Sequence, residues 1–196
     1  MVLLLLHMEI KALGCHSALI KGKKEIILIN PSEDYLKKDK SSRIAVFTSE
    51  DFDGIGLMDN KVLIRGPGEY EVGGIEILGL AGGEGKTIYT INVDGISVLV
   101  LGQLNEVLSD KKVEKINSID VLLAPISIGD KSSFKLVKEW TKKWGVNYLI
   151  PMGDDKEMLN KFLDEADEEG IEPLESLKVE KENLPEGLEL KLLKIV

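Results

Sequence analysis

The sequence predicts one α/β domain over residues 1–196, with a strand-rich first part and a second part in which strands alternate with helices. The length of 196 residues, 43% of them hydrophobic, is enough for one core but short for two domains of ~100–200 residues each. Short aliphatic runs separated by glycine-containing turns continue as far as Gly102. Beyond Gly102, apolar residues recur at helical spacing between continuously apolar runs.

The strands of the first part are aliphatic or β-branched runs that end at turn residues. They are predicted at Glu9–Leu13, Ala18–Lys21, Glu25–Ile29, Arg43–Phe47, Lys61–Ile64, Ile75–Leu80, Thr87–Val93 and Ile96–Leu101, with a very short strand among the turn residues of Gly66–Gly74. Asp94-Gly95 is a strong signal for a two-residue hairpin between the last two runs. We therefore expect a meandering antiparallel sheet.

The segment Gly82–Thr87 ends in Gly-Lys-Thr, as a phosphate-binding loop does. Such a loop needs a glycine where Leu80 stands, and it must open a helix, whereas Ile88–Ile91 continues as a strand. The segment is therefore predicted to be a hairpin turn.

The second part is predicted to alternate between helices and buried strands. A short helix begins near Ser109 or Asp110, and Phe134, Val137, Trp140 and Trp144 mark a helix that ends at Gly145. A further helix is predicted from about Asp154 to Glu169, before Gly170, and strands are predicted at Val121–Ile126, Tyr148–Ile150, Leu177–Val179 and Leu188–Val196.

Charge and cysteine content exclude several classes of function. Acidic residues outnumber basic ones 34 to 25, so the net charge of −9 argues against a nucleic-acid partner. One cysteine, Cys15, and two histidines, His7 and His16, exclude a disulfide framework and a multi-histidine metal site within one chain.

No apolar run reaches the ~18–20 residues of a membrane span, and Met1–Leu6 is too short for a signal peptide, so we expect a cytoplasmic protein with no membrane partner. Either Met8 is the natural start and residues 1–7 an extension before it, or Val2–Leu6 lengthens the first strand. An exposed strand there would favour a homo-oligomer.

Two short segments contain residues that could take part in catalysis or bind a metal. Cys15 and His16 are adjacent and would point to opposite faces of a strand, so Cys15 is predicted to be a small packed side chain rather than a nucleophile. Glu50, Asp51 and Asp53 directly follow a strand, where carboxylates either hold Mg²⁺ or Ca²⁺ or are solvated loop residues.

The order of elements resembles that of metallo-β-lactamase-fold hydrolases, and most closely the branch of ascorbate-6-phosphate lactonase and related metal-dependent hydrolases. The resemblance rests on Met8–Pro31, Val100–Leu104, Asp120–Ile126 and Tyr148–Gly153, which span nearly the whole chain in the family's order. It implies a four-layer αββα sandwich, here in a compact version, with two sheets packed face to face and helices outside.

The resemblance also implies where a two-metal site would lie. The family's Thr-His-x-His-x-Asp-His motif matches residues 48–54, where Ser49, Asp51 and Gly54 replace three histidines and Asp53 is retained. Gln103 replaces the bridging aspartate and Gly153 the late histidine, while Asn30 replaces the aspartate before Pro31 and His16 matches an early histidine. The predicted pocket, a vestige of the metal site, therefore comprises His16, Asp51, Asp53, Gln103 and Gly153.

Glycine has no side chain to bind a metal, and serine and glutamine are poor zinc ligands. Without the metal there is no bound water of lowered pKa to act as nucleophile. We therefore expect no cofactor and a non-catalytic binding or assembly module whose small-molecule or protein partner the sequence does not identify. The alternative is a phosphoester or lactone hydrolase in which Asp51 and Asp53, with Glu50, Glu106 and Asp154 nearby, hold one Mg²⁺ or Mn²⁺.

Overall fold

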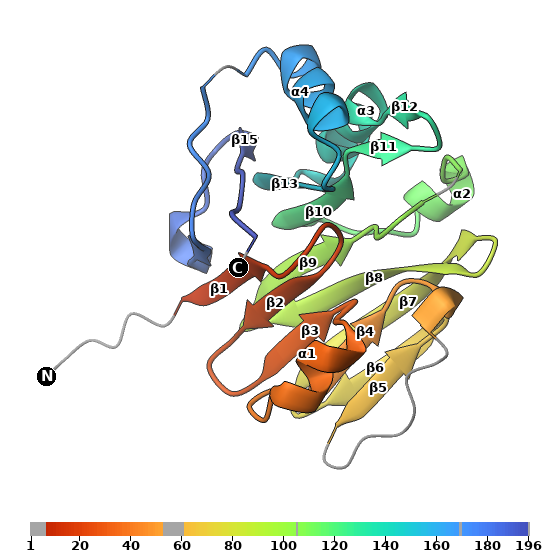
Figure 1. Cartoon of the computed structure of the whole chain (residues 1–196), viewed down its shortest axis with the longest axis vertical. Helices are drawn as coiled ribbons and strands as arrows, with labels where there is room; N and C mark the ends of the chain where they lie inside the picture. The colour runs from red at the N-terminus through yellow and green to blue at the C-terminus, as the bar shows by residue number, and fades with distance from the viewer. Residues whose placement is uncertain (1–6, 53–60, 105, 169, 196) are drawn as a thin grey trace, which may run out of the picture.

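The computed structural model describes residues 7–52, 61–104, 106–168 and 170–195 (Figure 1). Asp53, Gly54 and the apolar Val2–Leu6 segment lie outside the described residues. None of the described helices is long and apolar enough to cross a membrane.

Two stacked sheets form the centre of the molecule. The first sheet has the order β14-β1-β2-β3-β4-β5, with β1 Met8–Ala12, β2 Ala18–Lys21, β3 Ile26–Ile29, β4 Ile44–Phe47, β5 Val62–Arg65 and β14 Leu177–Val179. The second has the order β15-β13-β10-β9-β8-β7-β6, with β6 Gly68–Val72, β7 Ile75–Gly83, β8 Lys86–Val93, β9 Ile96–Val100, β10 Val121–Pro125, β13 Tyr148–Met152 and β15 Glu189–Leu190. A small hairpin of β11 Ser127–Ile128 and β12 Lys131–Ser132 stands apart.

Helices cover the outer faces and complete the predicted αββα sandwich. They are α1 Glu33–Lys38, α2 Asp110–Val113, α3 Phe134–Trp144 and α4 Lys156–Glu165. Figure 1 shows α1 in front of β3 and β4, and α3 and α4 gathered at β10 and β13. Leu36 of α1 packs on the outer side of the first sheet, and Phe134, Trp140 and Phe162 of α3 and α4 pack on that of the second.

The main core lies between the two sheets, where strands of both contribute alternate residues. Ile10, Ile20 and Ile27 of the first sheet and Ile91 and Val98 of the second are fully buried there. Because strand side chains alternate between faces, this pattern follows directly from the spacing of aliphatic residues in the sequence.

The predicted antiparallel meander is wrong at two steps. β1, β2 and β3 pair antiparallel, but β4 pairs parallel to both β3 and β5. The reason for the first step is α1, a six-residue crossover helix between β3 and β4 that was not predicted because only Leu36 of it is buried and no apolar period marks it. The chain then passes from β5 in the first sheet to β6 in the second.

The predicted helices of the second part are present with shifted ends. Gly145 ends α3 in the left-handed conformation, as expected, and the Trp144 ring nitrogen donates to the carbonyl of Val113 over 3.0 Å. α4 ends at Glu165 rather than Glu169, and Asp167 just beyond it has a left-handed φ of 57°. The predicted strand Leu188–Val196 is reduced to β15 and two isolated bridges, Ala12 with Ile195 and Leu174 with Leu193.

The largely buried carboxylate of Asp39 joins the end of α1 to the start of β5. Asp39 accepts hydrogen bonds from Ser41, from Ser42 and, over 2.9 Å, from the ammonium of Lys61. Burial alone would raise the pKa of Asp39, but these donors outweigh it and hold the pKa well below its usual range. Asp39 therefore stabilises the fold as an anion.

We expect Asp39→Asn to lower the free energy of unfolding by about 1–3 kcal/mol at pH 7, because Lys61 loses its charged partner. The pKa of Asp39 is lower in the folded than in the unfolded protein. The stability that its carboxylate adds is therefore fully present above the unfolded pKa of ~3.9 and is lost as the pH falls through the folded pKa. Urea unfolding of the wild type and of Asp39→Asn at pH 7 and at pH 3 measures the difference in stability at neutral pH and its decrease in acid. Asp130→Asn, at an exposed position, is the control, and an equal loss for the two variants would contradict the prediction.

Candidate functional site

The predicted site residues gather at one edge of the sandwich, where several strands end. Ser49 and Asp51 follow β4, Gln103 follows β9, Gly153 follows β13, and His16 lies in the turn between β1 and β2. Ser49, Gln103 and Gly153 thus follow the carboxyl ends of three strands. His16 lines a small cavity with Gly102 and Met152, the neighbours of Gln103 and Gly153, whereas Ser49 and Asp51 contact Lys86.

A lysine occupies the position between two predicted ligand positions. The ammonium of Lys86 is 2.7 Å from the hydroxyl of Ser49 and 2.8 Å from a carboxylate oxygen of Asp51, and the Ser49 hydroxyl donates to that same oxygen over 2.6 Å. We call these three residues the lysine cluster. The pKa of Asp51 is lowered, mainly by the hydrogen bond that its carboxylate accepts from Lys86.

The β7–β8 hairpin carries Lys86 to this place. Its tip pairs with the segment after β4: the amide of Glu50 donates to the carbonyl of Gly85 over 3.1 Å, and the amide of Thr87 donates to the carbonyl of Thr48 over 2.9 Å. The predicted hairpin turn is thus confirmed, whereas its contact with the opposite sheet was not predicted.

Asn30 fixes the end of β4 through its side-chain amide. The amide nitrogen donates to the carbonyl of His16 over 3.0 Å and to the hydroxyl of Thr48 over 2.8 Å, and the amide oxygen accepts from the amide of Thr48 over 2.8 Å. An aspartate here would have no donor for the His16 carbonyl. Asparagine at this position therefore has a structural role that the family's aspartate would not fulfil.

Two glycines at the site are closely covered by neighbouring side chains. A Cβ at Gly153 would lie 2.5 Å from both Cγ1 and Cδ1 of Ile126, and a Cβ at Gly102 would overlap the side chain of Thr48. The backbone of Gly102 also has a left-handed φ of 63°. The position of the family's late histidine is thus filled by an aliphatic core residue.

His16 is retained but faces a nearly closed space. It lines a cavity of only about 10 Å³ together with Ile29, Gly102 and Met152, among others, and its Nδ1 has no hydrogen-bond partner among the described residues. Burial lowers the pKa of His16, against the opposing effect of the Asp154 carboxylate, so its ring is neutral at pH 7.

Cys15 lies beside Asp154, not in the lysine cluster. It is half-buried and free, and burial followed by the Asp154 carboxylate raises the pKa of its thiol. A protonated thiol is a weak nucleophile. That Cys15 serves as a small packed side chain stays a prediction.

The remaining candidate carboxylates are dispersed. Glu50 and Glu106 lie against Gly85 and Gly83 of the hairpin tip, and Asp154 lies beside Cys15. Within the part of the chain that the structure describes, no three His, Cys, Asp or Glu residues are grouped as metal ligands. The donor set that is described, a hydroxyl and one carboxylate already bound to an ammonium, does not fit the family's two-metal site.

Sequence reasoning missed Lys86 and Ile126, the two residues that fill the site. Lys86 was assigned to a hairpin turn and Ile126 to the end of a buried strand, whereas Lys86 begins β8 and Ile126 directly follows β10. The signal for Ile126 lies in pairing, because β10 runs parallel to β13 with Pro125 opposite Met152, which sets the next residues, Ile126 and Gly153, side by side.

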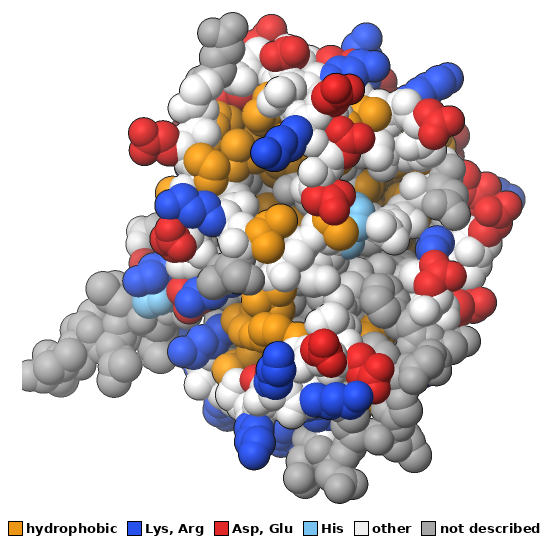
Figure 2. Space-filling model, viewed as in Figure 1, with side chains coloured by type: hydrophobic (Ala, Val, Ile, Leu, Met, Phe, Trp, Pro, Cys, Tyr) orange, Lys and Arg blue, Asp and Glu red, His pale blue; other side chains and the backbone are white. Residues whose placement is uncertain are grey.

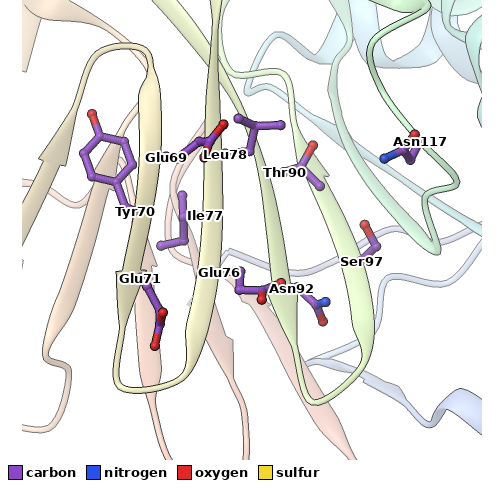
Figure 3. A pocket seen from close by; sticks show the side chains of 10 residues that line it. All are labelled: Glu69, Tyr70, Glu71, Glu76, Ile77, Leu78, Thr90, Asn92, Ser97 and Asn117. Atoms are coloured by element: carbon purple, nitrogen blue, oxygen red, sulfur yellow. The ribbon is translucent and has the colours of Figure 1, made fainter.

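A separate hollow of about 520 Å³ lies on the outer face of β6–β9, away from the predicted residues (Figure 3). Glu71 and Glu76 are directly opposite each other on β6 and β7, and Glu69 and Asn92 also line it. It combines carboxylates and amides on an open sheet face. None of the predicted site residues lines it.

Comparisons with known proteins agree with this fold. The family model described as the β-lactamase superfamily domain matches residues 9–153. None of the curated proteins matches the chain in sequence. Among solved structures, a protein of the metallo-β-lactamase superfamily from Thermotoga maritima superposes with a TM-score of 0.76 at 23% identity, covering 95% of this chain and 99% of the other.

Two further solved structures share the fold at lower identity. A metallo hydrolase from the archaeon Ignicoccus hospitalis has a TM-score of 0.61 at 16% identity, covering 89% of this chain and 99% of the other. The metallo-β-lactamase fold protein YhfI from Bacillus subtilis has a TM-score of 0.62 at 9% identity, covering 95% of this chain and 97% of the other. None of these comparisons singles out the ascorbate-6-phosphate lactonase branch, which stays a prediction.

Restoring a histidine at position 153 should fail for steric reasons. We expect Gly153→His to lower the free energy of unfolding by about 1–3 kcal/mol, because its Cβ overlaps Ile126. Combined with Ile126→Ala, which alone costs about 2–5 kcal/mol, the loss should be less than the sum of the two single losses. Urea denaturation of the four proteins measures this coupling.

Gly187→His is the matched control, because nothing lies within 4 Å of a Cβ at that position. Strict additivity of Gly153→His and Ile126→Ala would show that Ile126 does not obstruct position 153.

Proposed function

Because the chain belongs to the β-lactamase superfamily while Lys86 and Ile126 occupy the space at places where metal ligands of the family would lie, we propose that it is a metal-independent, non-catalytic binding or assembly module. It would thus be a pseudoenzyme that keeps the scaffold of a hydrolase. Its partner is a small molecule or a protein, and its compartment the cytoplasm.

The lysine cluster carries this proposal. Ser49 and Asp51 match two histidines of the family motif, and both bind the ammonium of Lys86, whose side chain is only 11% exposed. An ammonium neutralises a carboxylate, but it has no vacant coordination position with which to lower the pKa of a water molecule. The site therefore has a cation that organises the loop and supplies no hydroxide.

A second candidate function is hydrolysis of a phosphoester or lactone with one Mg²⁺ or Mn²⁺. The observation in its favour is the Asp51 side chain, which is 79% exposed and so is open to water and to a hard cation. One similar solved structure is that of a metallo hydrolase. In this case Asp51 would exchange Lys86 for the metal, with Asp53 as the second carboxylate.

Metal content and cation titration separate the two functions. We expect the purified protein to contain well below one Zn, Mn or Fe per chain by elemental analysis, and Mn²⁺ to produce no saturable relaxation enhancement of water protons. Lys86→Met should change neither result, since removing the ammonium leaves Asp51 without the imidazoles that a metal site needs.

The hydrolase alternative gives the opposite results. Under it, Lys86→Met would tighten Mn²⁺ binding by removing a competing cation, and Asp51→Asn would abolish both binding and hydrolysis of a phosphodiester or lactone probe. Asp130→Asn controls for the change of charge. Stoichiometric, saturable metal binding by the wild-type protein would overturn the proposed function.

A further inference from the structure

A cavity of about 500 Å³ lies between the turn after β1, the end of β13, the helix α4 and the C-terminal segment. We call it the Cys15 cavity. Its size is that of pockets that hold small organic molecules, ~300–1,000 Å³. On the face shown in Figure 2, hydrophobic side chains gather in the upper half, between α4 and the C-terminal segment, with charged side chains around them.

The walls of the Cys15 cavity are mainly aliphatic. Ala12, Met152, Leu159, Leu192 and Leu193 come from four separate segments of the chain. The C-terminal segment closes one side, because Leu174 bridges to Leu193 and Ala12 bridges to Ile195. A ligand would therefore bury an aliphatic body against side chains that the fold already holds in place.

The charged side chains at and beside the cavity differ in whether a neighbouring group pairs with them. The ammonium of Lys194 is 2.6 Å from a carboxylate oxygen of Glu175. The neighbouring Asp155 serves as the N-cap of α4, where it accepts from the amide of Met158 over 3.0 Å. Asp154 caps no helix and forms no ion pair with any residue that the structure describes.

The groups that face Asp154 leave its negative charge uncompensated. The thiol of Cys15 is protonated at neutral pH, and the buried ring of His16 is neutral. Lys194 also lines the cavity but is already bound to Glu175. Among the described lining residues, the carboxylate of Asp154 is therefore the one charge without a counterion.

We propose that the Cys15 cavity binds a small amphipathic amine, with the aliphatic body against Leu159 and Leu193 and the ammonium on the carboxylate of Asp154. This inference rests on the proposed function and gives the module a class of ligand. A fatty acid of the same length is disfavoured, because its carboxylate would face Asp154. An alcohol would form the same apolar contacts and lack the charge interaction.

The experiment compares three probes of equal chain length, n-octylamine, 1-octanol and octanoate, below their micelle concentrations in 150 mM salt. Binding to the full chain is followed by the chemical shifts of backbone amides. We expect shifts at Gly14, Gly153 and Leu159, with octylamine binding about tenfold more tightly than octanol and octanoate most weakly.

Two substitutions test the assignment of the contacts. Asp154→Asn should remove the preference for octylamine over octanol and leave octanol binding unchanged. Asp164→Asn, the same charge change at an exposed position of α4, should leave the preference intact. Leu159→Trp, which fills the cavity, should weaken the binding of the amine and the alcohol alike.

The inference is overturned if octanoate binds as tightly as octylamine, if the shifts map outside the cavity, or if Asp154→Asn and Asp164→Asn behave alike. Failure of the proposed function is recognised separately, since it appears as stoichiometric metal in the same protein preparation. The order of the three probes is measured both with and without EDTA, so a metal-dependent result is distinguished from one that depends only on Asp154.

Discussion

The arrangement of the site depends on the pairing of the β7–β8 hairpin tip with the segment that follows β4. Two backbone hydrogen bonds, from Glu50 to Gly85 and from Thr87 to Thr48, connect the edge of one sheet to the other. Gly83 and Gly85 have positive φ values of 111° and 69°, which allows the tip to lie directly against carboxylate side chains. Once this pairing forms, Lys86 has to lie beside Ser49 and Asp51.

An ammonium at this position has different consequences from a metal ion. A divalent metal organises ligands from several strands because it accepts four or more donors with fixed geometry. Lys86 donates at most three hydrogen bonds and carries one charge, so it fixes only the loop next to it. The other strand ends need other constraints, and the structure provides them in the Asn30 amide and in the contact of Ile126 with Gly153.

Most strands were predictable from the sequence because aliphatic alternation and glycine turns are local signals, whereas the αββα layers followed from the family resemblance. The sequence did not predict the parallel pairing of β4, since the crossover helix α1 is too short to show an apolar period. Nor did it place Lys86, whose neighbours are 35 or more residues away in the chain. The position of each substituted ligand was predictable from the resemblance, but what fills its space depends on pairing between distant segments.

The contacts around Asn30 depend on one another. Gly102 leaves room for the side chain of Thr48, and Thr48 is the partner of Asn30, which in turn holds the carbonyl of His16. A return of one metal-binding side chain would therefore disturb a contact without completing a ligand set. Packing and hydrogen bonds among the described residues thus hold strand ends where the family's metal ligands would lie. The turn that carries His16 is held through its backbone carbonyl, which accepts from Asn30, while its buried Nδ1 has no hydrogen-bond partner among the described residues.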